Sequence, residues 1–379
     1  MLKERINGNL KFIQVIIGLR QVGKSTAIKQ LIDAVSCDVF FYNCDSVIPH
    51  THQWLSMQWQ EAARNKGKTL LVFDEIQKIV GWSEVVKSLY DASRSREDFY
   101  VVLLGSASLT IQQGLNDSLA GRYELIEAHH WFFSEAEKVF GVSIKDYLKF
   151  GGYPAAYDLI SDTDRWQSFM QNSIVEPVIG KDLQGLAQIK KPALFRQAFE
   201  LTLRYPAQEI SYQKMLGQIQ GRGNVATIKH YLKLFEGAFL IKILEKYSGS
   251  TLRMKTSSPK IIVMDTGLLH AFKNPDMVDT DAEYFGRVFE NAIGAHLAKQ
   301  NGRLSYWRKG PMEVDFVWQT RWGNYAIEVK SGRLRNLGGP SQMAAELPDF
   351  IPVVIDFEKG CELLSSRVVT KKLMDSFKC

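Results

Sequence analysis

The chain has 379 residues, of which 45% are hydrophobic and 23% are charged, a composition typical of a water-soluble globular protein. This length exceeds that of one ordinary hydrophobic core, so we expect about two or three domains. No apolar run approaches the roughly 18 residues of a membrane span, and there is no N-terminal signal pattern, so we expect a cytoplasmic protein without a membrane partner. The formal net charge of +6 permits a nucleic-acid partner but does not require one.

The first predicted element is a short buried strand at residues 15–17, followed by a glycine-rich loop and a helix over residues 26–34. The loop reads Gly18-Leu19-Arg20-Gln21-Val22-Gly23-Lys24-Ser25. This is the pattern Gly-x-x-x-x-Gly-Lys-Ser of a phosphate-binding loop in its usual strand-to-helix setting. Glycine is expected at both ends of the pattern, because a side chain there would hinder the backbone from curling around a triphosphate. The alternative, a glycine turn with a solvated lysine, is disfavoured because strand, loop, lysine and serine coincide.

The loop predicts how a nucleoside triphosphate and Mg²⁺ would be held. Lys24 is expected to reach the β- and γ-phosphates, and the Ser25 hydroxyl is expected to bind Mg²⁺. The positive end of the helix that begins at Thr26 would face the anion. The predicted nucleotide-binding residues are therefore Gly18, Gly23, Lys24, Ser25, Thr26 and, from the next motif, Asp74.

Two acids end the next strongly apolar strand, after a predicted strand at residues 39–43 and a helix at 51–65. Residues 69–75 read as that strand, with Asp74 and Glu75 last. Carboxylates at the carboxyl end of a strand are typical of a nucleotide site. Asp74 would hold Mg²⁺ through water, and Glu75 would orient or deprotonate the attacking water. The alternative is an acidic loop that caps the following helix.

Two more candidate residues follow. Ser106, near the end of the strand that begins at residue 100, is a candidate sensor of the γ-phosphate or the lytic water. A turn serine with local hydrogen bonds is an equally good interpretation. Arg122 is a candidate arginine finger that would neutralise charge on the phosphates of a neighbouring subunit in a homo-oligomer, and the alternative is a surface arginine. The alternation of strands and helices predicts a parallel sheet with helices on both faces.

These residues resemble a known family. The loop at 18–25 and the segments 71–77, 105–108 and 119–122 are similar to bacterial and archaeal AAA-type ATPases whose C-terminal part is an uncharacterised domain (DUF4143). Further signatures of that family match residues 151–154, 259–261, 265–268, 290–291, 313–316 and 327–330. The resemblance implies ATP as the nucleotide and a winged-helix-like segment downstream of the ATPase domain.

The middle of the chain has the outline of a helix-turn-helix. Residues 209–216 predict a short helix with a serine cap, and a glycine-rich turn at 221–224 precedes a second helix. The apolar face of the second helix carries Ile228, Tyr231, Leu232 and Phe235.

Strands at 239–241 and 252–254 could supply a wing beside this helix pair. Lys229, His230 and Lys233 on the polar face, with Arg222 in the turn, could meet DNA phosphates. The alternative is a small helical domain whose charged face is simply solvated.

The last third of the chain contains a second possible chemical site. A helix at 284–293 carries Glu290, and strands are predicted at 304–308, 313–318 and 325–330. Alternation along the second strand would put Asp315 and Val317 on one face and Phe316 on the other. Glu328 and Lys330 share a face of the third strand because they are two residues apart.

Asp315 followed by Glu328-x-Lys330 on the next strand resembles the arrangement of restriction-endonuclease-like PD-(D/E)xK nucleases. In that arrangement Asp315 and Glu328, with Glu290 as a further ligand, would hold a second Mg²⁺ or Mn²⁺. Lys330 would steady the nucleophilic water or the phosphate charge, and Gln342 would help from downstream. The alternative is a set of cross-strand ion pairs on a solvated face.

The sequence therefore predicts an α/β chain of three parts: a P-loop ATPase domain at 1–150, a helical winged-helix-like domain at 151–270 and a restriction-endonuclease-like domain at 271–379. Two functions remain open. The first is an ATP-hydrolysing enzyme coupled to a DNA-binding or nuclease-like module. The second is a nucleotide-gated regulator, slow at hydrolysis, that recognises DNA or a protein through an inactive nuclease-like scaffold.

Overall fold

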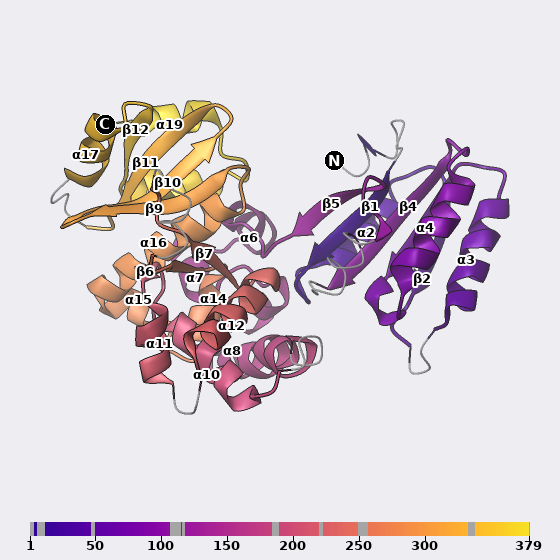
Figure 1. Cartoon of the computed structure of the whole chain (residues 1–379), viewed down its shortest axis with the longest axis horizontal. Helices are drawn as coiled ribbons and strands as arrows, with labels where there is room; N and C mark the ends of the chain where they lie inside the picture. The colour runs from indigo at the N-terminus through magenta and orange to yellow at the C-terminus, as the bar shows by residue number, and fades with distance from the viewer. Residues whose placement is uncertain are drawn as a thin grey trace. The chain divides into compact units, whose positions relative to one another are not determined.

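The computed structural model describes residues 4–5, 12–46, 50–106, 115, 118–183, 189–219, 223–248, 257–332 and 338–378 (Figure 1). The chain divides into two compact units, Met1–His129 and His130–Cys379. Within the described ranges, no helix is long and apolar enough to cross a lipid bilayer. The predicted subdivision of the second unit near residue 270 stays a prediction.

The first unit is built on one five-stranded sheet in the order β2-β3-β4-β1-β5, and every strand runs parallel to its neighbours. The strands are β1 (Ile13–Gly18), β2 (Asp38–Asn43), β3 (Thr69–Asp74), β4 (Phe99–Ser106) and β5 (Tyr123–Ala128). The sequence predicted the first four but not β5. This strand lies at an edge of the sheet and is largely half-buried, so its sequence carries no continuous apolar run.

Helices cover both faces of this sheet: α2 (Lys24–Ile32), α3 (His52–Arg64), α4 (Trp82–Ser93) and a short 3₁₀ turn at Ile76–Lys78. Leu31 of α2 packs in one core cluster with Val72 of β3. Because side chains alternate along a strand, Phe73 points to the opposite face, where its ring stacks on Trp59 of α3 with the ring centroids 6.4 Å apart. The predicted parallel sheet with helices on both faces is thus confirmed.

The second unit begins with a helical region. Its described α-helices up to residue 237 are α6 (Phe133–Phe140), α7 (Ile144–Phe150), α8 (Thr163–Phe169), α10 (Pro192–Leu203), α11 (Tyr212–Gln218) and α12 (Val225–Gly237). Between them lie a 3₁₀ helix at Pro154–Leu159 and π-helical segments at Met170–Val175 and Pro177–Asp182. The predicted serine cap is present, because the Ser211 hydroxyl accepts a hydrogen bond from the Lys214 backbone N–H. The predicted apolar face of α12 is buried, with Ile228 and Phe235 fully covered.

A small antiparallel sheet accompanies these helices. It has the order β6-β8-β7, from β6 (Gln208–Glu209), β7 (Ile241–Leu244) and β8 (Lys260–Val263). The first predicted wing strand, at 239–241, is displaced toward the C-terminus because Phe239 has a left-handed backbone with φ of 58°. The second predicted wing strand, at 252–254, and the turn residue Arg222 lie outside the described residues.

The C-terminal part contains a four-stranded sheet in the order β12-β11-β10-β9. Its strands are β9 (Arg303–Lys309), β10 (Met312–Thr320), β11 (Gly323–Val329) and β12 (Phe350–Ile355), and only β11 and β12 are parallel. Helices α14 (Thr266–His270), α15 (Met277–Thr280) and α16 (Ala282–Ala298) precede the sheet, α17 (Gly338–Glu346) precedes β12, and α18 (Phe357–Ser365) and α19 (Lys371–Ser376) follow it. The three predicted strands are present, whereas β12 was not predicted.

The predicted side-chain alternation along β10 is wrong at one place. The pairing of β10 with β9 shifts between Val314 and Val317, which marks a bulge with an extra residue. Val314 and Val317 consequently join the same core cluster with Met343 of α17. Asp315 therefore does not share a face with Val317. Lys260 of β8 lies between Asp315 and Glu290 of α16 and contacts both.

Two glycine-containing signatures that are far apart in the sequence meet around Asp265. One Asp265 carboxylate oxygen accepts from the Gly152 N–H at 2.5 Å, and the other accepts from the Gly267 N–H at 3.0 Å. A Cβ on Gly151 would lie 2.1 Å from the carboxylate, so the close approach requires glycine there. Burial raises the pKa of Asp265 to about 6 and lowers the pKa of nearby Lys299 to about 8.

Replacing Asp265 with Ala is expected to lower the free energy of unfolding by about 3–5 kcal/mol. The change leaves two buried N–H groups without their acceptor and removes negative charge near the buried Lys299 ammonium. Urea unfolding followed by tryptophan fluorescence measures the loss. The matched control is Asp276→Ala, whose exposed carboxylate pairs with Lys149 and should contribute no more than about 1 kcal/mol. Equal midpoints for the two variants would contradict this role.

Candidate functional site

The phosphate-binding loop joins the end of β1 to the start of α2. Gly23 precedes the helix with a φ of 90°, in the left-handed region that favours glycine, and Gln21 has a φ of 60°. Gly18 is required for a reason that the sequence did not reveal. A Cβ there would lie 2.1 Å from the Ala128 carbonyl oxygen on β5, so this glycine permits close strand packing.

The loop and the acidic strand end meet at one point. The Ser25 hydroxyl donates to Asp74 Oδ2 at 2.7 Å, although 49 residues separate the two. Asp74 Oδ1 is buried and, among the described residues, has no hydrogen-bond partner. A hydroxyl beside a carboxylate with a spare oxygen is the kind of oxygen donor set that Mg²⁺ takes, so these residues fit the ion.

Lys24 is folded back onto its own loop. Its side chain is buried, and Nζ donates to the Gly18 carbonyl at 3.0 Å and to the Leu19 carbonyl at 2.6 Å. The ammonium is therefore held at the loop by groups that a phosphate can replace. Thr26 lies exposed on the first turn of α2, next to the same loop.

Glu75 and Ser106 are brought together, and a third residue joins them. Ser106 lies opposite Gly18 in the pairing of β4 with β1, which places it beside the loop. Its hydroxyl donates to Glu75 Oε2 at 3.1 Å, and Gln77 Nε2 donates both to the Ser106 hydroxyl at 2.9 Å and to Glu75 Oε2. Glu75 itself has a left-handed backbone with φ of 55°, a strained conformation for glutamate.

Gln77 joins this candidate site although the sequence motifs do not assign it a role. Its Oε1 is buried and, within the described residues, accepts no hydrogen bond. In the sequence, Gln77 ends the family-like segment 71–77, two residues after the acid pair, but no general spacing rule gives an amide there a role. The contact arises because the 3₁₀ turn at Ile76–Lys78 bends the chain back toward β4.

Arg122 lies at the end of the sheet where β1 begins, whereas the loop lies at the end where β1 finishes. It directly precedes β5, and its carbonyl accepts from the N–H of Ile13, the first residue of β1, whereas the loop follows the last residue of β1. The start and the end of β1 are about 17 Å apart, at about 3.3 Å per residue. The guanidinium instead makes a two-pronged ion pair with Asp91 at 2.8 and 2.9 Å, which lowers the pKa of Asp91.

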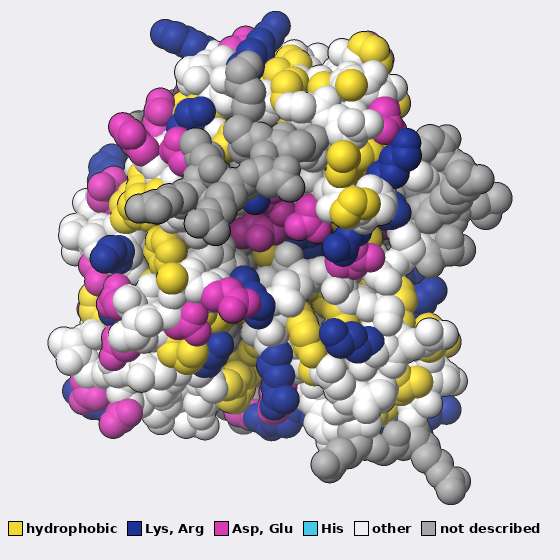
Figure 2. Space-filling view, turned by 90° about the vertical axis from the view of Figure 1, so that its left-hand side faces the viewer, with side chains coloured by type: hydrophobic (Ala, Val, Ile, Leu, Met, Phe, Trp, Pro, Cys, Tyr) yellow, Lys and Arg dark blue, Asp and Glu magenta, His cyan; other side chains and the backbone are white. Residues whose placement is uncertain are grey.

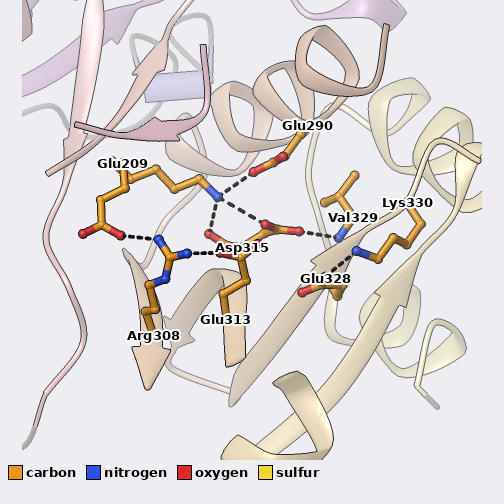
Figure 3. A network of polar contacts seen from close by, with 9 residues as sticks. Glu209, Glu290, Arg308, Glu313, Asp315, Glu328, Val329 and Lys330 are labelled. Carbon is orange, nitrogen blue, oxygen red and sulfur yellow. Dashed lines mark hydrogen bonds and ion pairs between the residues drawn. The ribbon is translucent and has the colours of Figure 1, made fainter. Parts of the chain in front are cut away.

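The predicted acidic cluster of the second unit is present, but a lysine from another strand enters it (Figure 3). Lys260 of β8 places its Nζ 2.5 Å from Glu290 Oε1 and 3.3 Å from Asp315 Oδ1. Although burial alone would lower the pKa of Lys260, the two carboxylates raise it above its usual value. Burial and the Asp315 charge raise the pKa of Glu290 to about 8.

The other predicted members of this cluster also have partners. Lys330 pairs with Glu328 at 2.6 Å, as the two-residue spacing predicts, and Asp315 Oδ2 accepts from the Val329 N–H at 2.9 Å. Burial, with the Asp315 charge, raises the pKa of Glu328 to about 7. Gln342 donates to Glu346 of its own helix. Across the residues that the structure describes, no three His, Cys, Asp or Glu side chains are arranged to hold a metal, and Lys260 lies between Glu290 and Asp315.

Family models match three consecutive segments of the chain. Residues 11–137 match a model described as an AAA domain, which contains the loop and the acid pair. Residues 142–278 match a domain of unknown function (DUF8612), and residues 285–350 match a domain of unknown function (DUF4143). The DUF4143 match is thus narrower than the resemblance implied, because a different model covers the helical region and β8.

Sequence similarity to other proteins covers most of this chain. An uncharacterized protein of Methanocaldococcus jannaschii is 25% identical over 80% of this chain and 71% of its own length, and one of Haemophilus influenzae is 24% identical over 81% and 79%. Among solved structures, the Walker-type ATPase of Pyrococcus abyssi is 11% identical with a TM-score of 0.49, covering 71% of this chain and 93% of that one. The segment matches, with the loop and sheet described above, support an AAA-type P-loop ATPase domain joined to a chain that carries a DUF4143 segment.

Proposed function

We propose that the first unit binds ATP with Mg²⁺ and hydrolyses it. The observation that carries this proposal is the 2.7 Å hydrogen bond between Ser25 and Asp74, with Glu75 and Ser106 beside the same loop. Ser25 and Asp74 would hold Mg²⁺, which supplies positive charge to the β- and γ-phosphates. Lys24 would exchange the two loop carbonyls for phosphate oxygens. Glu75 would accept a proton from the attacking water, and Ser106 would orient the carboxylate.

Replacing Lys24 with Ala is expected to weaken ATP binding about 10- to 100-fold, because a charge-assisted hydrogen bond is worth about 1.5–3 kcal/mol. Isothermal titration with a non-hydrolysable ATP analogue and Mg²⁺ measures the dissociation constant. The control is Lys29→Ala, an exposed lysine of the same helix that should leave the constant unchanged. An unaltered dissociation constant in the Lys24 variant would refute the nucleotide site.

We further propose that α12 contacts DNA as the second helix of a winged-helix-like segment. The order α10, β6, α11, α12, β7, β8 and the antiparallel sheet β6-β8-β7 support this arrangement. Lys229, His230 and Lys233 are exposed on α12. The two lysines line a hollow of about 630 Å³ together with Lys242 and Arg303. Lys242 and Arg303 pair with Glu236 and Glu245 of the same hollow, so Lys229 and Lys233 account for its excess of positive charge toward phosphates. On the face of the molecule shown in Figure 2, basic side chains are interspersed with acidic ones.

Replacing Lys229 and Lys233 with Ala is expected to reduce the salt dependence of duplex DNA binding. Each lost phosphate contact lowers the slope of log K against log salt concentration by about 1, so the double variant should lose about 2. Fluorescence anisotropy with a labelled duplex at four salt concentrations measures the slope. The control is Lys309→Ala, whose exposed ammonium pairs with Glu346 outside α12. Equal slopes for wild type and the double variant would reject α12 as the contact.

A further inference from the structure

Lys260 occupies the centre of the acidic cluster in the second unit. Its side chain is 8% exposed, and Nζ contacts Glu290 of α16, both Asp315 Oδ1 and the Asp315 carbonyl of β10, and the face of the Phe316 ring at 4.8 Å from the centroid. The ammonium thus joins three elements, β8, α16 and β10, at one buried point. Its three protons can reach Glu290 Oε1, Asp315 Oδ1 and the Asp315 carbonyl, so the ammonium contacts two of the three carboxylates that the sequence assigned to a divalent ion.

A divalent ion and this ammonium cannot share the same oxygens. Mg²⁺ binds oxygen at about 2.0–2.1 Å and demands a nearly octahedral shell, whereas Lys260 Nζ already stands 2.5 Å from Glu290 Oε1. Displacing Lys260 Nζ from these oxygens would leave a buried ammonium without its counter-charges, which destabilises the fold. The remaining carboxylate, Glu328, is paired with Lys330, so the cluster holds two lysines against three acids.

We infer that Lys260 is the resident cation of this centre and takes the place of the divalent ion that a PD-(D/E)xK nuclease would bind. The centre is therefore a metal-free ion-pair cluster that fastens β8 to α16 and β10, and it does not cleave DNA by a metal-dependent route. This inference is independent of the ATP site, because it concerns residues of the second unit only. It also favours the scaffold function for the nuclease-like part over a catalytic one.

The test is a titration of the full-length chain with Mn²⁺ in the absence of nucleotide, followed by electron paramagnetic resonance of free Mn²⁺. Wild type and Asp315→Asn should bind the same amount, because no ion occupies the cluster. Lys260→Met, which removes the charge and keeps the apolar stem, should bind one additional Mn²⁺ per chain. The double variant Lys260→Met with Asp315→Asn should lose it, and Lys260→Arg, which keeps a cation, should not gain it.

Two results would overturn the inference. The first is Mn²⁺ binding by wild type that Asp315→Asn abolishes, and this comparison decides the question even if Lys260→Met does not fold. The second is a folded Lys260→Met chain, verified by circular dichroism, that binds no more Mn²⁺ than wild type. Ser25 and Asp74 are unchanged in all these variants, so Mn²⁺ bound there would cancel in the comparison.

Discussion

Replacing Glu75 with Gln is expected to lower the turnover of ATP by about 10²- to 10⁴-fold, the range that a positioned general base contributes. Gln keeps the size of the side chain but cannot accept a proton from water. ATP binding should be preserved, because in the proposed site the loop and Lys24, rather than Glu75, would contact the phosphates. The variant should therefore trap bound ATP.

Steady-state phosphate release at saturating ATP, together with a dissociation constant for ATP, separates the two effects of Glu75→Gln. The control is Glu84→Gln, an exposed acid in the first turn of α4 that should leave both quantities unchanged. Turnover within a factor of about 3 of wild type would argue for the nucleotide-gated regulator, because that function does not depend on rapid hydrolysis.

The arrangement of the candidate nucleotide site could largely be predicted from the sequence, because its residues belong to contiguous motifs. The loop, the helix start and the acid pair each follow a strand, and parallel strands bring their carboxyl ends to one edge of the sheet. Gln77 could not be predicted in the same way. Its contact with Ser106 depends on how tightly the 3₁₀ turn after Glu75 bends, and a left-handed φ at a glutamate has no signature in the sequence.

The acidic cluster shows the opposite limit of sequence reasoning. The alternation rule correctly placed Glu328 and Lys330 on one side of the chain, because Glu328 lies in the regular end of β11 and Lys330 directly follows its last residue. It failed for Asp315, because a bulge shifts the alternation of β10 by one residue. Lys260 could not be assigned to the cluster at all, since it precedes Asp315 by 55 residues and comes from a different sheet. The signals for Lys260 were its place in the family signature at 259–261 and its charge at the start of an otherwise apolar, buried strand, and neither indicates a contact with Asp315.

The strand register decides whether Arg122 can reach the candidate nucleotide site of its own chain. Arg122 sits at the start of β5, beside the start of β1, and the phosphate-binding loop follows the other end of β1 about 17 Å away. An arginine side chain cannot span that distance. Within its own chain Arg122 therefore cannot reach the nucleotide, and any role as an arginine finger must be played toward a second copy of the chain.

Replacing Arg122 with Ala is expected to lower ATP turnover by about 10³-fold or more, as the loss of an arginine finger does, while ATP affinity stays unchanged. The control is Arg94→Ala, an exposed arginine at the end of α4, which should keep wild-type turnover. Loss of ATP binding by the Arg122 variant would instead assign the residue a structural role through its ion pair with Asp91.

Mixing two inactive variants tests whether Arg122 acts between chains. The Lys24→Ala chain binds ATP poorly but retains Arg122, whereas the Arg122→Ala chain binds ATP but lacks the guanidinium. Because each supplies what the other lacks, an equimolar mixture should recover turnover well above the sum of the separate variants, and the recovery should increase with total protein concentration. A mixture no more active than its components, under conditions where the wild-type chains associate, would exclude Arg122 as a finger donated from one chain to the next.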